Sequence, residues 1–239
     1  MAEKELTGAP AADERKRAEG KRTADRLREE YSAQGDANGW FDACYRSANR
    51  DFSLVPWAHM EPRPKLLRWL RALPPAERHG HALDVGCGIG DNAAALANAG
   101  YRVTAFDISP TAVAWAADRF KDIPIEWRVG DLLAPPDDWR RAFVLVSEVY
   151  TLQSLREPYR SAALGVIGEY VKLGGRLLII CRGRKEGDLF DPPPWPLTEG
   201  EIDRIAALGL KRVSFEEFFT EGPGGPIRHF LAEYRRVTG

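Results

Sequence analysis

The 239-residue sequence contains only three cysteines, at positions 44, 87 and 181, and only four histidines. Cysteines placed so far apart form neither a disulfide framework nor the paired spacing of a zinc site, so we predict no metal. Cys87 and Cys181 stand in apolar contexts and are expected to be small buried side chains. Few histidines also leave few candidates for a general base.

The sequence also lacks an excess of charge of either sign and any long hydrophobic run. Its net charge is −1, whereas proteins that bind nucleic acid usually carry a basic excess, so we predict no nucleic-acid partner. The longest apolar run, residues 177–181, is too short to cross a bilayer, and the N-terminus lacks the apolar segment of a secretory signal. We therefore expect a cytoplasmic protein without a membrane partner. Monomer and dimer are both compatible with the sequence.

The N-terminal third divides into two predicted parts. Residues 1–35 are charge-dense, with too few apolar positions for a buried stripe, and predict a disordered leader; the alternative is a cap that orders when ligand binds. Residues 36–79 carry clustered aromatic side chains and then a short amphipathic helix, which we interpret as a lid over a site.

Residues 81–107 organise the rest of the chain. They read as a strand, a turn with three glycines, an alanine-rich helix stopped by Gly100, and a second strand that ends on Asp107. These are the parts of a βαβ unit that binds a nucleotide-type cofactor. Strands and helices then alternate as far as residue 181, which predicts a parallel sheet covered by helices on both faces.

The C-terminal region departs from this alternation. Thr198 and Glu201 predict a capping box at a helix start, and two strand-like runs follow at residues 211–219 and 227–237 with no helix between them. Two such strands should pair antiparallel. We therefore predict, over residues 80–239, a doubly wound α/β sheet that is mostly parallel and ends in an antiparallel hairpin.

The glycine turn itself narrows the choice of cofactor. The glycines fall at 86, 88 and 90, and a dinucleotide fingerprint wants a small residue where this chain has Asp91. We expect the Asp91 carboxylate to face, and so repel, a bound pyrophosphate. Asp84 adds a second acid, and the pair favours a cofactor without phosphates.

These motifs resemble those of class I S-adenosylmethionine-dependent methyltransferases. The resemblance rests on Asp84, the three glycines, Asp107 and the Gly130–Asp131 pair, and it implies a seven-stranded Rossmann-like sheet with an antiparallel last strand. It also implies the cofactor S-adenosylmethionine and the contacts that hold it. Gly86 and Gly88 would allow its close approach, Asp107 would bind both ribose hydroxyls, and Ile108, Asp131 and Leu132 would surround the adenine; Asp84 and Gly90 complete the predicted cofactor set.

The outer regions are similar to the thiopurine S-methyltransferase-like enzymes, which methylate small sulfur-containing or related molecules. This resemblance rests on Trp40 and Trp57 before the sheet, on Arg156, and on the proline-rich loop around Trp195. It implies that Trp40 and Trp57 cover the cofactor. Arg156 and Trp195 would line the pocket of the acceptor.

Two residues remain as candidates near the chemistry. Glu148 ends the fourth predicted strand and would bind the sulfonium region of the cofactor, a substrate amine or only water; His59 would be a base or an ordinary surface histidine. Methyl transfer is an in-line displacement on an activated carbon, and a thiol needs little help from a base. The lack of a convincing histidine base therefore favours a small thiol, or an amine that is already deprotonated, as acceptor.

Other functions stay open at this stage. An O- or N-methyltransferase of a secondary metabolite has the same cofactor site, and an NAD-dependent oxidoreductase uses the same βαβ unit. A binding module without catalysis is a further alternative. A nucleic-acid methyltransferase fits less well, because the fourth strand leads into Ser147-Glu148-Val149-Tyr150 and not into an Asn-Pro-Pro-Tyr type motif.

Overall fold

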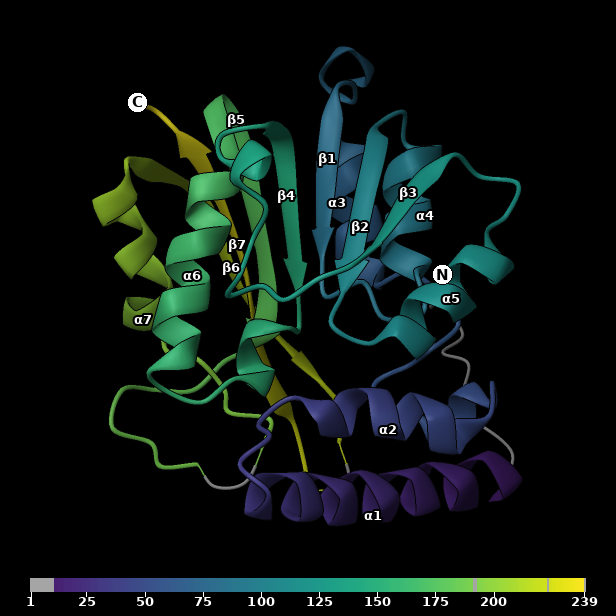
Figure 1. Cartoon of the computed structure of the whole chain (residues 1–239). Coiled ribbons are helices and arrows are strands. Elements are labelled where there is room, and N and C mark those ends of the chain that lie inside the picture. The colour runs from purple at the N-terminus through teal and green to yellow at the C-terminus, as the bar shows by residue number, and fades with distance from the viewer. Residues whose placement is uncertain (1–10, 191–192, 223, 239) are drawn as a thin grey trace, which may run out of the picture.

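The computed structural model describes residues 11–190, 193–222 and 224–238, and its centre is one seven-stranded sheet with the strand order β3-β2-β1-β4-β5-β7-β6 (Figure 1). Neighbouring strands are parallel from β3 to β5, while β7 runs antiparallel to both β5 and β6. The predicted mostly parallel sheet with an antiparallel C-terminal hairpin is confirmed. The strands are β1 (His81–Val85), β2 (Arg102–Asp107), β3 (Ile125–Val129), β4 (Phe143–Val149), β5 (Val171–Arg182), β6 (Leu210–Thr220) and β7 (Ile227–Arg236).

Helices cover both faces of the sheet because side chains along each strand alternate between two apolar layers. One layer packs beneath α3 (Pro64–Ala72) and α4 (Asp91–Asn98), through residues such as Leu66 and Leu96. The other packs beneath α6 (Tyr159–Tyr170) and α7 (Glu199–Asp203). In the described part of the chain, no helix is both long enough and apolar enough to span a membrane.

Local capping signals determine where two helices start. Ser109 precedes α5 (Pro110–Arg119) and its hydroxyl accepts a hydrogen bond from the Ala112 amide, with proline at the first helical position. Thr198 and Glu201 form the predicted capping box at the start of α7. Both helix starts are therefore where the sequence placed them.

The expected disorder of the N-terminal leader is wrong for the residues that the structure describes. Ala11–Ala33 form a helix, α1, which packs on α2 (Gly39–Ala48); residues 1–10 lie outside the described residues. Among the side chains of α1 that the structure describes, residues 14–33, the buried positions are Gly20, Ala24 and Leu27. Gly20 lies so close to Leu54 that an added Cβ would stand 2.3 Å from its carbonyl oxygen. Because most of these residues are small, the pattern of apolar side chains in the sequence did not reveal the buried face of this helix.

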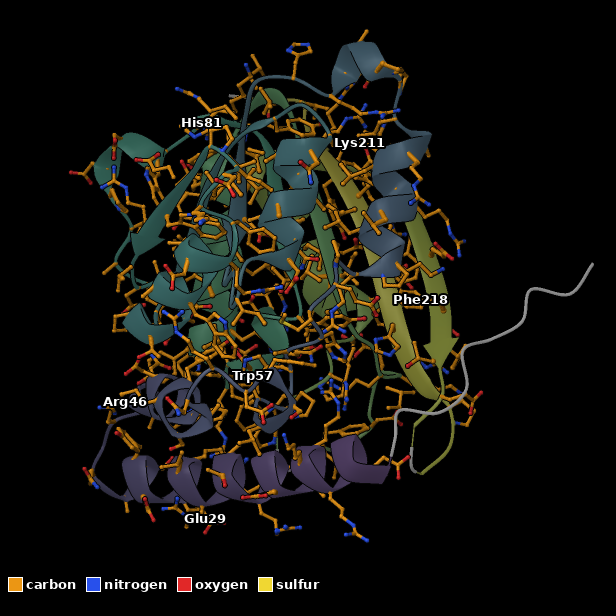
Figure 2. All side chains as sticks on the ribbon, turned by 90° about the vertical axis from the view of Figure 1, so that its right-hand side faces the viewer. Glu29, Arg46, Trp57, His81, Lys211 and Phe218 are labelled. Atoms are coloured by element: carbon orange, nitrogen blue, oxygen red, sulfur yellow. The ribbon has the colours of Figure 1, made fainter. Side chains whose placement is uncertain are left out.

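Helices α1 and α2 and the short helix η1 (Phe52–Leu54) lie across the carboxyl ends of the parallel strands (Figure 1). In the turned view Trp57 lies between this cover and the sheet, and Glu29 and Arg46 lie on the cover helices below it (Figure 2). Tyr45 of α2 packs into a cluster with Ile89 and Trp115, which anchors the cover to the sheet domain. The predicted boundaries near residues 35 and 79 stay predictions.

Candidate active site

The glycine turn follows β1, and β1 lies beside β4 at the point where the strand order reverses. Ligands of open α/β sheets bind at the carboxyl edge beside such a point. Gly86, Gly88 and Gly90 all have positive φ angles, of 65°, 53° and 91°. Glycine is the residue type that adopts this conformation without strain, so the backbone of the turn depends on all three.

The three glycines nevertheless face different surroundings. A Cβ atom on Gly88 would have the Tyr45 hydroxyl oxygen, at 3.0 Å, as its one neighbour within 4 Å. An added Cβ would meet Thr151 Oγ1 at 2.3 Å on Gly86 and the Trp127 ring at 2.6 Å on Gly90. Gly88 is thus the position that leaves room for a ligand, whereas Gly86 and Gly90 allow close packing of the protein itself.

Asp107 ties the turn to the end of β2. Its Oδ2 accepts the Gly88 amide at 2.9 Å and its Oδ1 accepts the Ser109 amide at 2.9 Å. Each carboxylate oxygen keeps lone-pair capacity for a further donor, as a pair of ribose hydroxyls would require. Burial raises the pKa of this carboxyl, against the lowering effect of its backbone hydrogen bonds. Ile108, the next residue, is half-buried.

Tyr45 is a site residue that sequence reasoning did not single out. Its hydroxyl lies next to Gly88 and accepts a hydrogen bond from Trp57 Nε1 at 2.7 Å. Burial, and then the nearby charge of Asp107, raises its pKa. Trp40 lies behind, 7% exposed, with its ring edge-on to Trp57 at 5.7 Å. The aromatic density of residues 40–57 was visible in the sequence, but helix geometry decides that Tyr45 faces the glycine turn.

The expectation for Asp91 is wrong. Its carboxylate does not face a ligand but pairs with Arg119, at 2.7 and 3.0 Å, and both side chains are largely buried. Because Arg119 neutralises it, Asp91 provides no argument against a pyrophosphate. That argument now rests on Asp84 alone.

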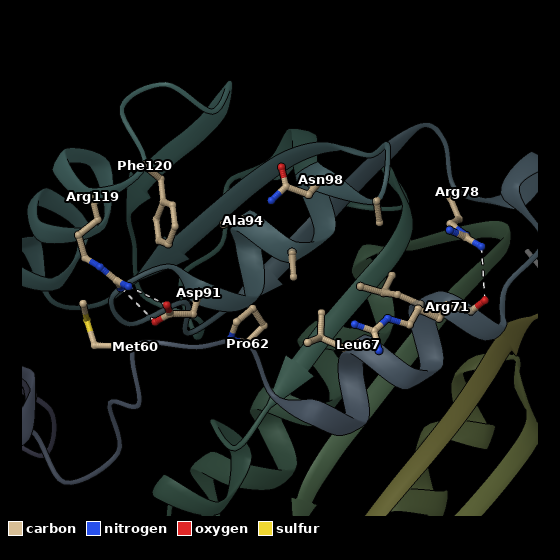
Figure 3. Close-up of a pocket in the computed structure, with 13 residues that line it drawn as sticks. Met60, Pro62, Leu67, Arg71, Arg78, Asp91, Ala94, Asn98, Arg119 and Phe120 are labelled. Carbon is tan, nitrogen blue, oxygen red and sulfur yellow. Dashed lines mark hydrogen bonds and ion pairs between the residues drawn. The ribbon is translucent and has the colours of Figure 1, made fainter. Parts of the chain in front are cut away.

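The Asp91–Arg119 pair lies at one end of a groove of about 460 Å³, with Arg71 and Arg78 at the other end (Figure 3). The groove is lined by residues of α3, α4 and the end of α5, together with Met60 and Pro62. Tyr45, Gly88 and Asp107 do not line it. We therefore do not assign this groove to the cofactor.

Asp84 and Glu148 are buried acids on neighbouring strands. Among the described residues, Asp84 Oδ2 and Glu148 Oε2 have no hydrogen-bond partner, while Glu148 Oε1 accepts the amides of Thr151 and Leu152 at 2.7 and 2.9 Å. Burial raises the pKa of each to about 7. Strand alternation directs Asp84 towards the α4 face and Glu148, like Val146, towards the α6 face. Buried acids with such shifts are typical of functional sites.

The raised pKa of Glu148 predicts a pH-dependent stability. A carboxyl whose pKa is 4.5 when unfolded and about 7 when folded binds its proton more tightly in the folded state, so stability falls as pH rises from 4.5 to 7. We expect Glu148→Gln to remove this slope. In urea unfolding, the difference in free energy of unfolding between the variant and wild type should be roughly 2 kcal/mol higher at pH 8 than at pH 5, because only wild type loses stability over that range. Equal differences at both pH values would contradict the prediction.

The other predicted site residues are scattered around this edge. Asp131 is exposed and its Oδ1 accepts the Leu133 amide, whereas Leu132 is buried in the α6-side core. His59 is exposed at the end of the cover. The structure does bring Arg156 and Trp195 together, with the guanidinium 4.9 Å from the ring centroid.

Sequence reasoning also did not single out a pair of residues at the end of β4. Tyr150 follows the strand with φ +68°, and its hydroxyl lies 3.1 Å from His229 Nδ1, 79 positions along the chain. His229 Nε2 lies 2.9 Å from Thr220 Oγ1. No local pattern links these residues, because β7 reaches this edge only through the hairpin.

The residues of this edge fit S-adenosylmethionine. The open side of Gly88, beneath the Tyr45 hydroxyl, accommodates close approach of a ligand. Asp107 can accept two ribose hydroxyls, and the unpaired Oδ2 of Asp84 belongs to the strand that leads into the glycine turn. In the described residues no group of three His, Cys, Asp or Glu side chains is placed to hold a metal.

Comparison with known proteins supports this assignment. Residues 82–175 match the family model of a methyltransferase domain. No curated protein sequence matches the chain significantly. Among solved structures, one described for the conversion of a disulfide bond into a thioacetal group during echinomycin biosynthesis has a TM-score of 0.66 and 22% identity, covering 82% of this chain and 90% of that one.

Two further structures are described as methyltransferases. The N-methyltransferase NodS of Bradyrhizobium japonicum, in complex with S-adenosyl-L-homocysteine, has a TM-score of 0.62 and 20% identity, covering 81% of this chain and 98% of that one. A SAM-dependent methyltransferase of Methanosarcina mazei has a TM-score of 0.61 and 19% identity, covering 75% and 100%. Residues 82–175 thus match a methyltransferase domain, and the chain shares the fold of these solved structures.

Proposed function

We propose that this chain transfers the methyl group of S-adenosylmethionine to a small molecule held between the carboxyl edge of the sheet and the cover formed by α1 and α2. The observation that carries the proposal is that the Asp107 carboxylate accepts the Gly88 amide beneath Tyr45 and keeps acceptor capacity for a pair of ribose hydroxyls. Trp57, between the cover and the sheet, donates a hydrogen bond to the Tyr45 hydroxyl of α2.

The edge divides into two halves. Gly88 and Asp107 belong to β1 and β2, whereas Tyr150 follows β4 and His229 lies on β7. We assign the first half to the cofactor and the second to the acceptor. The cofactor supplies a methyl carbon already activated by a sulfonium. The protein then has to align the acceptor with that carbon and exclude water, which in well-oriented systems lowers a barrier by roughly 7–11 kcal/mol.

A thiol is our first candidate for the acceptor atom. With a pKa near 8.5, a thiol already provides some thiolate at neutral pH and needs little assistance. The echinomycin-related structure is named for sulfur chemistry, although NodS is named as an N-methyltransferase. The thiopurine S-methyltransferase-like resemblance points the same way, and there we assign Arg156 and Trp195 to the outer wall of the acceptor pocket.

A hydroxyl acceptor is the second candidate, and the Tyr150–His229 pair favours it. Tyr150 Oη could take the proton of an acceptor hydroxyl while its own proton passes to His229 Nδ1, 3.1 Å away. Burial, together with the charges of Arg182 and Arg63, lowers the pKa of His229 to about 4, so its imidazole is neutral at pH 7 but is a weak base in the ligand-free protein. We assign to this pair the proton relay for a hydroxyl acceptor, which the sequence did not reveal.

A matched acceptor panel tests the proposal. The full-length protein is incubated with S-adenosylmethionine and thiophenol, phenol or aniline, and products are identified by mass spectrometry. We expect methylated thiophenol or phenol and an equal amount of S-adenosylhomocysteine. Tyr150→Phe should reduce methylation of phenol far more than that of thiophenol. Binding of the cofactor without turnover of any acceptor would indicate a binding module, and binding of NAD alone would overturn the proposal.

A further inference from the structure

Four side chains gather at the acceptor half of the edge, and we call them the edge cluster: Arg63, Tyr150, Arg182 and His229. Arg63 directly precedes α3, Tyr150 follows β4, Arg182 is the last residue of β5, and His229 lies near the start of β7. Since β7 is antiparallel to β5, its start lies at the carboxyl edge, where Arg182 and His229 are directly paired across the sheet. Four separate elements thus bring these groups together.

The contacts of the cluster hold it in place. The Arg63 guanidinium lies 4.9 Å from the centroid of the Tyr150 ring and donates to the carbonyl of Trp57 at 3.1 Å. The Arg63 backbone amide donates to Asn92 Oδ1 at the start of α4. Arg63 therefore contacts three parts of the site: Trp57 below the cover, the start of α4, and Tyr150 in the acceptor half.

Neither arginine of the cluster has an anionic partner. Arg119, Arg160 and Arg184, which are also shielded from solvent, each bind a carboxylate at 3.0 Å or less. In the part of the chain that the structure describes, the half-buried guanidinium groups of Arg63 and Arg182 form no ion pair. Asp91, which attracts Arg63 from a distance, is itself bound to Arg119.

Among the described residues, these two half-buried positive charges thus have no ion-pair partner, and Asp91 and the exposed Glu61 attract Arg63 only from a distance. Burial lowers the pKa of both Arg63 and Arg182. Their charges also act together on their neighbours, since Arg182 and Arg63 both lower the pKa of His229, after burial, and Arg63 opposes the rise that burial causes in the pKa of Tyr150. Desolvated charges are costly unless they are paired, so the site favours an anion from outside the chain.

We propose that Arg63 and Arg182 bind an anionic oxygen group, a carboxylate or phosphate, carried by the methyl acceptor. A guanidinium presents a planar fork of donors that matches either group, and bidentate pairs are the strong form of this interaction. The inference rests on the proposed function and specifies the substrate class of its acceptor half. The bound anion would also favour protonation of His229, which couples recognition of the acceptor to uptake of its proton.

The test uses the full-length protein saturated with S-adenosylhomocysteine. Benzoate, phenyl phosphate and benzamide are titrated by calorimetry, and the His229 imidazole signal is followed by NMR. We expect one anion or both to bind at least about tenfold more tightly than neutral benzamide and to shift the His229 signal. The stronger anion identifies the group as carboxylate or phosphate. Equal binding of all three compounds, or no binding by either anion, would overturn the inference.

Variants separate this result from the proposed function. Arg63→Gln and Arg182→Gln should each reduce the anion preference, and Arg182→Lys should restore part of it. Arg102→Gln removes an exposed charge at the opposite end of the sheet and serves as the control. Calorimetry with S-adenosylhomocysteine verifies that each variant keeps a folded cofactor half. Methyl transfer without a preference for anions would contradict this inference alone. Anion binding without methyl transfer would contradict the proposed function alone.

Discussion

Asp107→Ala is expected to weaken binding of S-adenosylhomocysteine by about two orders of magnitude, the largest effect of any single change on cofactor binding. Hydrogen bonds to a charged group contribute roughly 1.5–3 kcal/mol each, and the variant would lose those to both ribose hydroxyls. It would also release the Gly88 and Ser109 amides, which Asp107 now holds at 2.9 Å. Isothermal titration calorimetry measures the change directly.

Two further variants make the result specific. Asp107→Asn keeps one carbonyl acceptor and should fall between wild type and Asp107→Ala. Asp122→Ala removes an exposed acid just after α5 and should leave the affinity unchanged. If Asp107→Ala is folded by circular dichroism and binds as tightly as wild type, the assignment of Asp107 to the ribose is wrong.

The largest effect on stability is expected from Arg236→Ala. Arg236 is 1% exposed, and its guanidinium donates to the carbonyls of Val171, Leu208 and Gly168 at 2.5–2.6 Å. These bonds join the end of β7 to the start of β5 and to the turn before β6. Its removal takes this donor from three carbonyls and leaves a cavity, although the Gly168 carbonyl still accepts the Val171 amide. We expect a loss of about 4 kcal/mol in the free energy of unfolding. Urea denaturation of the cofactor-free protein measures it.

The adjacent residue offers a matched control. Arg235 is exposed on the opposite side of β7, with Glu77 3.8 Å away as its ion-pair partner. Exposed pairs contribute about 0–1 kcal/mol, so Arg235→Ala should leave stability nearly unchanged. Similar losses for the two variants would show that the three carbonyl contacts of Arg236 have little net effect.

Elements with strong local signals were predictable from the sequence. Examples are the alternation of apolar residues along the strands, Ser109 before Pro110 and the capping box at Thr198. Each depends on residues close in sequence, and each is present in the structure. The N-terminal helix was missed because its buried face consists of Gly20, Ala24 and Leu27 among many charges. Small residues pack closely but contribute little hydrophobicity, so a pattern of apolar side chains does not reveal them.

The site shows the same division. The sequence by itself determined the α/β fold and the glycine turn that precedes Asp107, because these depend on short-range spacing within one βαβ unit. Only the tertiary structure decided that Gly88 faces Tyr45, that Asp91 pairs with Arg119, and that Tyr150, Arg182 and His229 meet at one edge. These contacts join residues tens of positions apart, and strand order and helix docking, not local propensity, place them within reach of one another.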